Sequence, residues 1–66
     1  MSTLGEEYPK QQARCRELLQ AYRDIGPVGA FGHAHISGVL KEADEAAISS
    51  DLPRMLSAYE AMKRCA

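Results

Sequence analysis

The chain has 66 residues, of which 45% are apolar and 26% charged, and its net charge is −1. This composition predicts one small globular domain and excludes a disordered segment. The charges are interspersed, which excludes both the basic excess of a typical nucleic-acid binder and the acidic excess of a nucleic-acid mimic. Because so short a chain builds only a small core, we expect burial against a partner protein or against a second copy in a homodimer.

The N-terminal segment, residues 1–7, has neither an apolar run nor a basic lead. It therefore predicts a flexible N-terminus and neither a signal peptide nor a membrane span. A first helix is expected over residues 8–25, with Pro9 in its first turn and Gly26 followed by Pro27 at its end. Its predicted apolar face comprises Tyr8, Gln11, Cys15, Leu18, Leu19, Tyr22 and Ile25.

A second helix is expected over residues 28–48 and a third over residues 51–64, joined by a short turn with candidate N-caps at its end. The predicted apolar face of the second comprises Val28, Gly32, Ile36, Val39, Leu40, Ala43, Ala46 and Ala47. That of the third comprises Leu52, Met55, Leu56, Tyr59 and Met62. Three short helices joined by tight turns indicate an all-α fold, an antiparallel bundle or a helical-hairpin arrangement, in a single domain over residues 8–66.

His33 and His35 suggest a metal site because imidazole is a common zinc ligand. Zinc needs three or four converging ligands, whereas helical residues two positions apart diverge by about 200°. No second ligand pair follows at a suitable spacing. Both are therefore interpreted as histidines at the boundary of the apolar face, with no metal and no cofactor.

The two cysteines, Cys15 and Cys65, occur without a secretory signal, which favours reduced thiols and a cytoplasmic location. Cys15 lies within the first apolar face and is expected to be a small buried residue. Cys65 lies next to the chain end, off the apolar face, and is expected to be exposed. A crosslink between the Cys65 residues of two copies under oxidation is favoured over catalysis, which needs a positioned base.

The carboxylates Glu42, Asp44 and Glu45 are assigned to a solvated helix face. General acid–base catalysis needs a pocket that shifts a pKa, and three helices this short hardly enclose one. The sequence also contains no phosphate-binding loop, nucleophile elbow or Ser/His/Asp arrangement. It predicts a protein that is not an enzyme and has no catalytic residues.

The connection between the first two helices, residues 26–32, is apolar, rich in glycine and carries the only Phe of the chain. One interpretation is structural: the glycines let two helix backbones approach closely while Phe31 covers the core. The other is functional: Val28, Phe31 and His35 form an exposed apolar edge that binds a partner protein or a second copy.

The same segment carries a resemblance. Ile25-Gly26-Pro27-Val28-Gly29-Ala30-Phe31-Gly32, followed by Ile36 and Leu40, then Ala43-Asp44-Glu45-Ala46 and Asp51-Leu52, resembles small helical proteins encoded in proteobacterial phages and prophages. The resemblance covers residues 8–64. It implies an accessory protein in the cytoplasm of a bacterial host that acts by protein–protein contact and modulates or inhibits a host protein. No activity is assigned to that group, so it implies no functional residue. Residues 43–61 also resemble helical-hairpin repeats, and this second resemblance implies only helical packing.

A small nucleic-acid-binding regulator that acts as a dimer is the alternative. Half of the basic residues lie on the first helix, namely Lys10, Arg14, Arg16 and Arg23. These side chains are distributed around all sides of the helix, and acidic residues lie between them. Only dimerisation would therefore assemble a basic patch. Nucleic acid is therefore the less favoured partner, and a membrane is not expected to be one. A self-assembling structural protein is a third interpretation.

Overall fold

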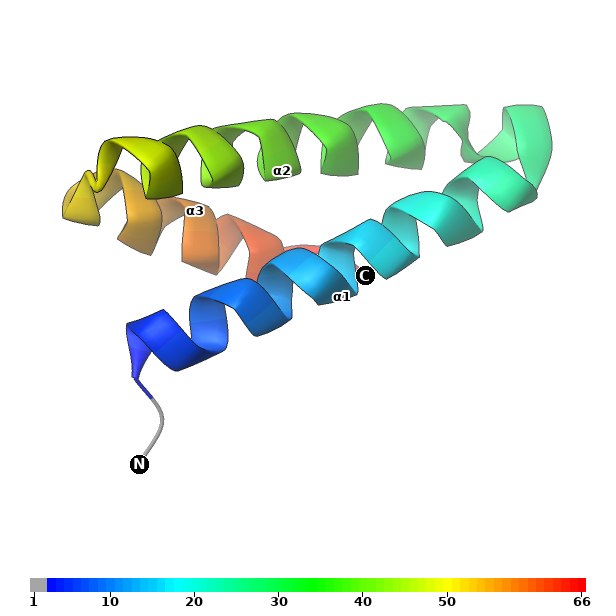
Figure 1. Cartoon of the computed structure of the whole chain (residues 1–66). Helices are drawn as coiled ribbons and strands as arrows, with labels where there is room; N and C mark the ends of the chain where they lie inside the picture. The colour runs from blue at the N-terminus through cyan, green and yellow to red at the C-terminus, as the bar shows by residue number, and fades with distance from the viewer. Residues whose placement is uncertain (1–2) are drawn as a thin grey trace.

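The structure is a computed structural model that describes residues 3–66, and all regular elements in this range are helices. They are α1 (Leu4–Asp24), the 3-10 helix η1 (Gly26–Gly29), α2 (Ala30–Ser49) and α3 (Leu52–Arg64). α1 and α2 form a hairpin that opens away from η1, and α3 folds back from the far end of α2 to lie against both (Figure 1). The predicted all-α fold with three helices is confirmed.

The first helix begins four residues earlier than predicted, at Leu4. Thr3 is its N-cap, in extended conformation, and its hydroxyl accepts a hydrogen bond from the backbone N–H of Glu6 at 3.2 Å. Glu6 and Glu7 lie in the first turn, where carboxylates stabilise the positive end of a helix. Residues 4–7 are therefore helical where the sequence predicts a flexible segment, and residues 1–2 lie outside the described residues.

Pro9 lies inside α1 and not in its first turn as predicted. It has no N–H to donate to the carbonyl of Gly5, so one intrahelical hydrogen bond is missing there. The helix nevertheless continues to Asp24, and Tyr8, just before Pro9, is buried in the core.

The junction of α1 and α2 depends on two glycines. Gly26 has a φ of +80°, in the left-handed region, and it follows the end of α1 as predicted. Gly29 is buried against α1, and a Cβ there would lie 2.2 Å from the carbonyl oxygen of Tyr22. A side chain at Gly32 would likewise collide with the ring of Tyr22. The predicted close approach of the two helix backbones is confirmed.

The turn between α2 and α3 is made by Ser50 and Asp51. Ser50 takes the left-handed conformation at φ 54°, and the backbone N–H of Asp51 reaches the carbonyl of Ala46 at 3.2 Å. Asp51 is the N-cap of α3, because its carboxylate accepts a hydrogen bond from the N–H of Arg54 at 3.3 Å. The short turn predicted before the third helix is therefore confirmed, with Asp51 as the cap among the candidates.

The core is small and built largely from short side chains. Its buried members are Tyr8, Cys15, Ile36, Leu40, Ala43, Ala58, Met62 and Cys65. Tyr8 also joins α1 to α2, because its hydroxyl donates to the carbonyl oxygen of Ala43 at 2.8 Å. Four residues predicted on the apolar faces are instead exposed: Ile25, Val28, Leu52 and Leu56.

In the described part of the chain, no helix has the length and apolarity needed to cross a membrane.

The C-terminal tail folds back onto the middle of α1 (Figure 1). The guanidinium of Arg14 donates to the carbonyl oxygens of Met62 and Cys65, the latter at 2.8 Å. The hydroxyl of Tyr22 donates to the carbonyl oxygen of Ala66 at 2.8 Å. These bonds hold Cys65 in the core with 6% of its surface exposed, so the prediction that Cys65 is exposed is wrong.

Two titratable groups of the core have raised pKa values. Burial raises the pKa of Tyr8, and the charges of Asp44 and Glu42 raise it further. Burial also raises the pKa of the Cys15 thiol, with a second contribution from the neighbouring Cys65 that Arg14 partly offsets. Both groups are therefore held in their neutral forms in the folded protein.

Gly38 and Gly29 offer a matched pair of glycine-to-alanine substitutions. A Cβ at Gly38 would lie in open space within α2, so Gly38→Ala should raise the free energy of unfolding by about 0.5–1 kcal/mol. Gly29→Ala should lower it by about 1–3 kcal/mol, because the new methyl group overlaps the backbone of Tyr22. Urea unfolding followed by circular dichroism measures both changes, and a Gly29→Ala variant as stable as wild type would contradict the close approach.

Stability should fall at alkaline pH because the pKa values of Cys15 and Tyr8 are raised by folding. Their ordinary values are 9.0 and 10.0, so the unfolded chain loses these protons first. The contribution is fully present below these values and is lost as pH rises through the folded values, at up to about 1.4 kcal/mol per pH unit for each group.

Urea unfolding between pH 7 and pH 11 measures this loss. Tyr8→Phe should flatten the part of the decline that lies above pH 10. Tyr59→Phe is the matched control, because it removes a phenol hydroxyl from a partly buried tyrosine outside the set of fully buried residues. A Tyr8→Phe variant with the same alkaline slope as wild type would argue against the raised pKa.

Candidate functional site

The apolar corner, as we call Ile25, Val28 and Phe31, lies where α1 passes through η1 into α2. Val28 and Phe31 are 88% and 89% exposed, and Ile25 is also exposed. Val28 and Phe31 are three positions apart in the continuous stretch of η1 and α2, a spacing that places them on one side of it, whereas Ile25 lies just before the left-handed Gly26. The corner is therefore a local cluster of large apolar side chains in contact with solvent.

The structure separates the two interpretations of the 26–32 connection. Phe31 does not cover the core, so that part of the structural interpretation is wrong. The predicted edge of Val28, Phe31 and His35 is at the surface, with His35 exposed one turn after Phe31 on α2. Whether this edge binds a partner stays a prediction.

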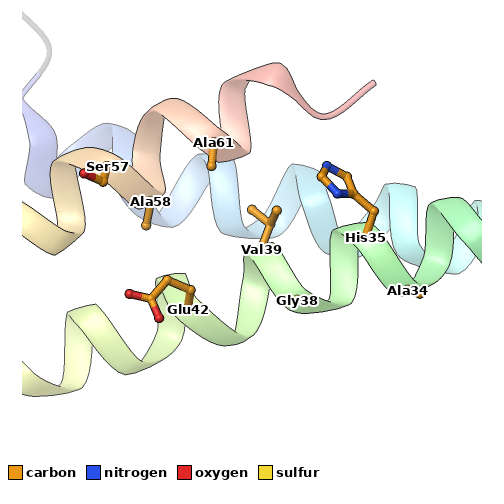
Figure 2. A pocket seen from close by; sticks show the side chains of 8 residues that line it. All are labelled: Ala34, His35, Gly38, Val39, Glu42, Ser57, Ala58 and Ala61. Carbon is orange, nitrogen blue, oxygen red and sulfur yellow. The ribbon is translucent and has the colours of Figure 1, made fainter.

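A groove between α2 and α3 continues from the apolar corner along the same face of α2. It has a volume of about 570 Å³ and is lined by Ala34, His35, Gly38, Val39, Glu42, Ser57, Ala58 and Ala61. Figure 2 shows His35 and Val39 rising from α2 toward α3, while Ala58 and Ala61 point back from α3. Because most of these side chains are small, the groove is shallow, open and predominantly apolar.

One residue that lines this groove, Glu42, belongs to an ion pair. The guanidinium of Arg54 lies 2.9 Å from the carboxylate of Glu42 and 3.8 Å from that of Glu45. The hydrogen bond from Arg54 lowers the pKa of Glu42, and the same bond raises the pKa of Arg54. The carboxylates that were predicted on a solvated helix face are thus at the surface, but Glu42 and Glu45 both pair with Arg54. Asp44 likewise pairs with Arg16 at 2.7 Å, which joins α1 to α2.

A second apolar cluster lies at the opposite end of α2, and we call it the far patch. It consists of Ile48 at the end of α2 and of Leu52 and Leu56 on the first two turns of α3. Ile48 is 86% exposed. Sequence reasoning missed this patch because it assigned Leu52 and Leu56 to the core. The one available signal was that Ile48 falls outside the predicted apolar face of α2.

The two histidines are not brought together with other metal-ligating groups. His33 is half-buried, whereas His35 is exposed at the groove. Among residues 3–66, no group of three or more His, Cys, Asp and Glu side chains is placed to hold a metal ion.

Five of the eight basic side chains are engaged by groups of the protein itself. Arg14 is bound by carbonyl oxygens of the tail, whereas four others form ion pairs: Lys10, Arg16, Arg54 and Lys63. Arg23, Lys41 and Arg64 form no ion pair with the described residues. They come from three different helices.

The chain matches no protein family, no curated protein and no solved structure. The resemblance to small phage-encoded proteins therefore stays a prediction.

Proposed function

We propose that this protein is a non-enzymatic binding module that contacts a partner protein through the apolar corner. The observation that carries the proposal is the exposure of Phe31 and Val28 side by side on a helical support. Aromatic side chains contribute disproportionately to the binding energy of protein interfaces, because a single ring buries a large apolar area. His35 and the α2–α3 groove extend the surface with polar and small side chains.

The resemblance to phage accessory proteins supports the choice of partner. In that setting the partner is a host or phage protein in the bacterial cytoplasm, and binding modulates or inhibits it. A second copy of the chain is the other occupant that the apolar corner would accept. The distribution of charge favours a protein over a nucleic acid, since five of the eight basic side chains are already engaged within the protein.

The central test compares Phe31→Ser with Ile48→Ser. Both substitutions replace an almost fully exposed apolar side chain of α2, at the two ends of the helix, so both variants should keep the wild-type circular dichroism spectrum. Affinity capture from bacterial lysate identifies a partner, which is then purified and titrated with each variant by calorimetry. Phe31→Ser should raise the Kd by at least about 30-fold, the loss typical of an interface hot spot, whereas Ile48→Ser should leave it within threefold.

Three results would count against the proposal. Equal affinities for wild type and Phe31→Ser would show that the apolar corner is not the binding surface. Recovery of the bait alone, together with a monomer in sedimentation velocity, would show that it has no protein partner under these conditions. A mobility shift with DNA or RNA at low salt that disappears steeply as salt rises would favour the nucleic-acid alternative.

A further inference from the structure

Cys15 and Cys65 lie against each other in the core, although fifty positions separate them in the sequence. Both are free thiols, 0% and 6% exposed. The Cys15 thiol lies 3.6 Å from the carbonyl oxygen of Met62, and the Cys65 thiol lies 3.5 Å from that of Ala61. The two thiols thus contact successive carbonyl groups in the last turn of α3, and both belong to the same buried cluster.

The neighbouring residues hold this pair in place. Arg14 is next to Cys15 on α1, and its guanidinium binds the carbonyl oxygens of Met62 and Cys65. Tyr22, two turns further along α1, binds the carbonyl oxygen of Ala66. The segment that carries Cys65 is therefore fixed on α1 at both sides of the cysteine. Bringing two distant cysteines together normally costs conformational entropy. Here folding has already brought them together, so this cost does not oppose formation of a disulfide.

We propose that Cys15 and Cys65 are a dithiol site that forms an intramolecular disulfide with a small disulfide oxidant such as oxidised glutathione. Fraying of the last two residues exposes Cys65, whose thiolate attacks one sulfur of the oxidant and releases one glutathione. The Cys15 thiolate then attacks the Cys65 sulfur of the mixed disulfide and releases the second glutathione. Two protein thiols and one oxidant give one protein disulfide and two glutathione thiols, so atoms and electrons balance.

The disulfide would fasten the C-terminal end of α3 to the middle of α1. It closes a long loop, and closing a long loop removes much of the conformational freedom of the unfolded chain. In a domain of this size, oxidation should therefore raise the thermal midpoint by about 10 °C or more. This inference differs from the predicted crosslink between two copies, because the thiol beside Cys65 in the folded protein is that of Cys15 in the same chain. It is independent of the proposed binding function.

The experiment incubates the full chain at pH 8 with oxidised glutathione and measures intact mass under non-reducing conditions. The expected product is a monomer lighter by two hydrogen atoms, with a proteolytic fragment that links residues 15 and 65 and with a raised thermal midpoint. A reductant should reverse both changes. A stable glutathione adduct, a disulfide-linked dimer or two unreacted thiols would each overturn the proposal.

Cys65→Ser is the matched control. It changes a residue of the tail and leaves Cys15 at its place on α1, so the variant should fold. Oxidised glutathione should not change its thermal midpoint. An equal rise of the midpoint in wild type and in Cys65→Ser would show that stabilisation does not come from a bond between the two cysteines. If the variant does not fold, the fragment analysis of the wild-type protein decides alone, because it identifies the bonded pair directly.

Discussion

The close approach of α1 and η1 at Gly29 is the constraint on which the rest of the molecule depends. The backbone of Gly29 packs on the carbonyl of Tyr22, and Gly32 packs on the ring of the same residue, so no side chain fits at either position. This contact fixes the rotation of α2 about its own axis. With Gly29 and Gly32 turned toward α1, the positions just before them, Val28 and Phe31, are rotated by about 100° to the side, and both are exposed. The same contact that closes the hairpin therefore exposes the apolar corner.

Tyr22 also connects this contact to the C-terminal tail, because its hydroxyl binds the carbonyl oxygen of Ala66. The core between α1 and α3 contains few large apolar side chains, and polar contacts supplement it. Arg14 occupies the end of α3, where the free carbonyls give the helix a negative end and a cation is favourable. Packing of α3 thus relies on hydrogen bonds at its last turn, which is also the place where Cys15 and Cys65 meet.

Much of the helical layout could be predicted from the sequence, since capping and turn chemistry are local: Gly26 ends α1 and Asp51 begins α3. Side-chain burial was harder to predict. A helical pattern of about 100° per residue predicted that Leu56 is buried and Cys65 exposed. Leu56 is exposed because α3 packs through the side that carries Ala58 and Met62. Cys65 is buried because the backbone becomes extended there and leaves the helical pattern. A small residue such as Ala58 gives only a weak apolar signal, although it is buried. For the candidate site, the exposed edge at Phe31 was predicted and the far patch was not.

Exposed apolar side chains are expected in a chain too short to cover them all, so exposure alone does not separate a binding surface from leftover surface. The difference between the apolar corner and the far patch lies in what binding would cost. Phe31 is an aromatic residue with two rotatable bonds, held on the first turn of a helix whose start is locked against Tyr22. Its backbone is already ordered, so association costs mainly the freedom of two side-chain torsions. Ile48 and Leu52 flank a turn that includes the strained residue Ser50, and neither offers a ring. An aromatic side chain on an ordered helical turn beside an open apolar groove would bind at the lower cost, and this is why the proposed contact is placed at Phe31.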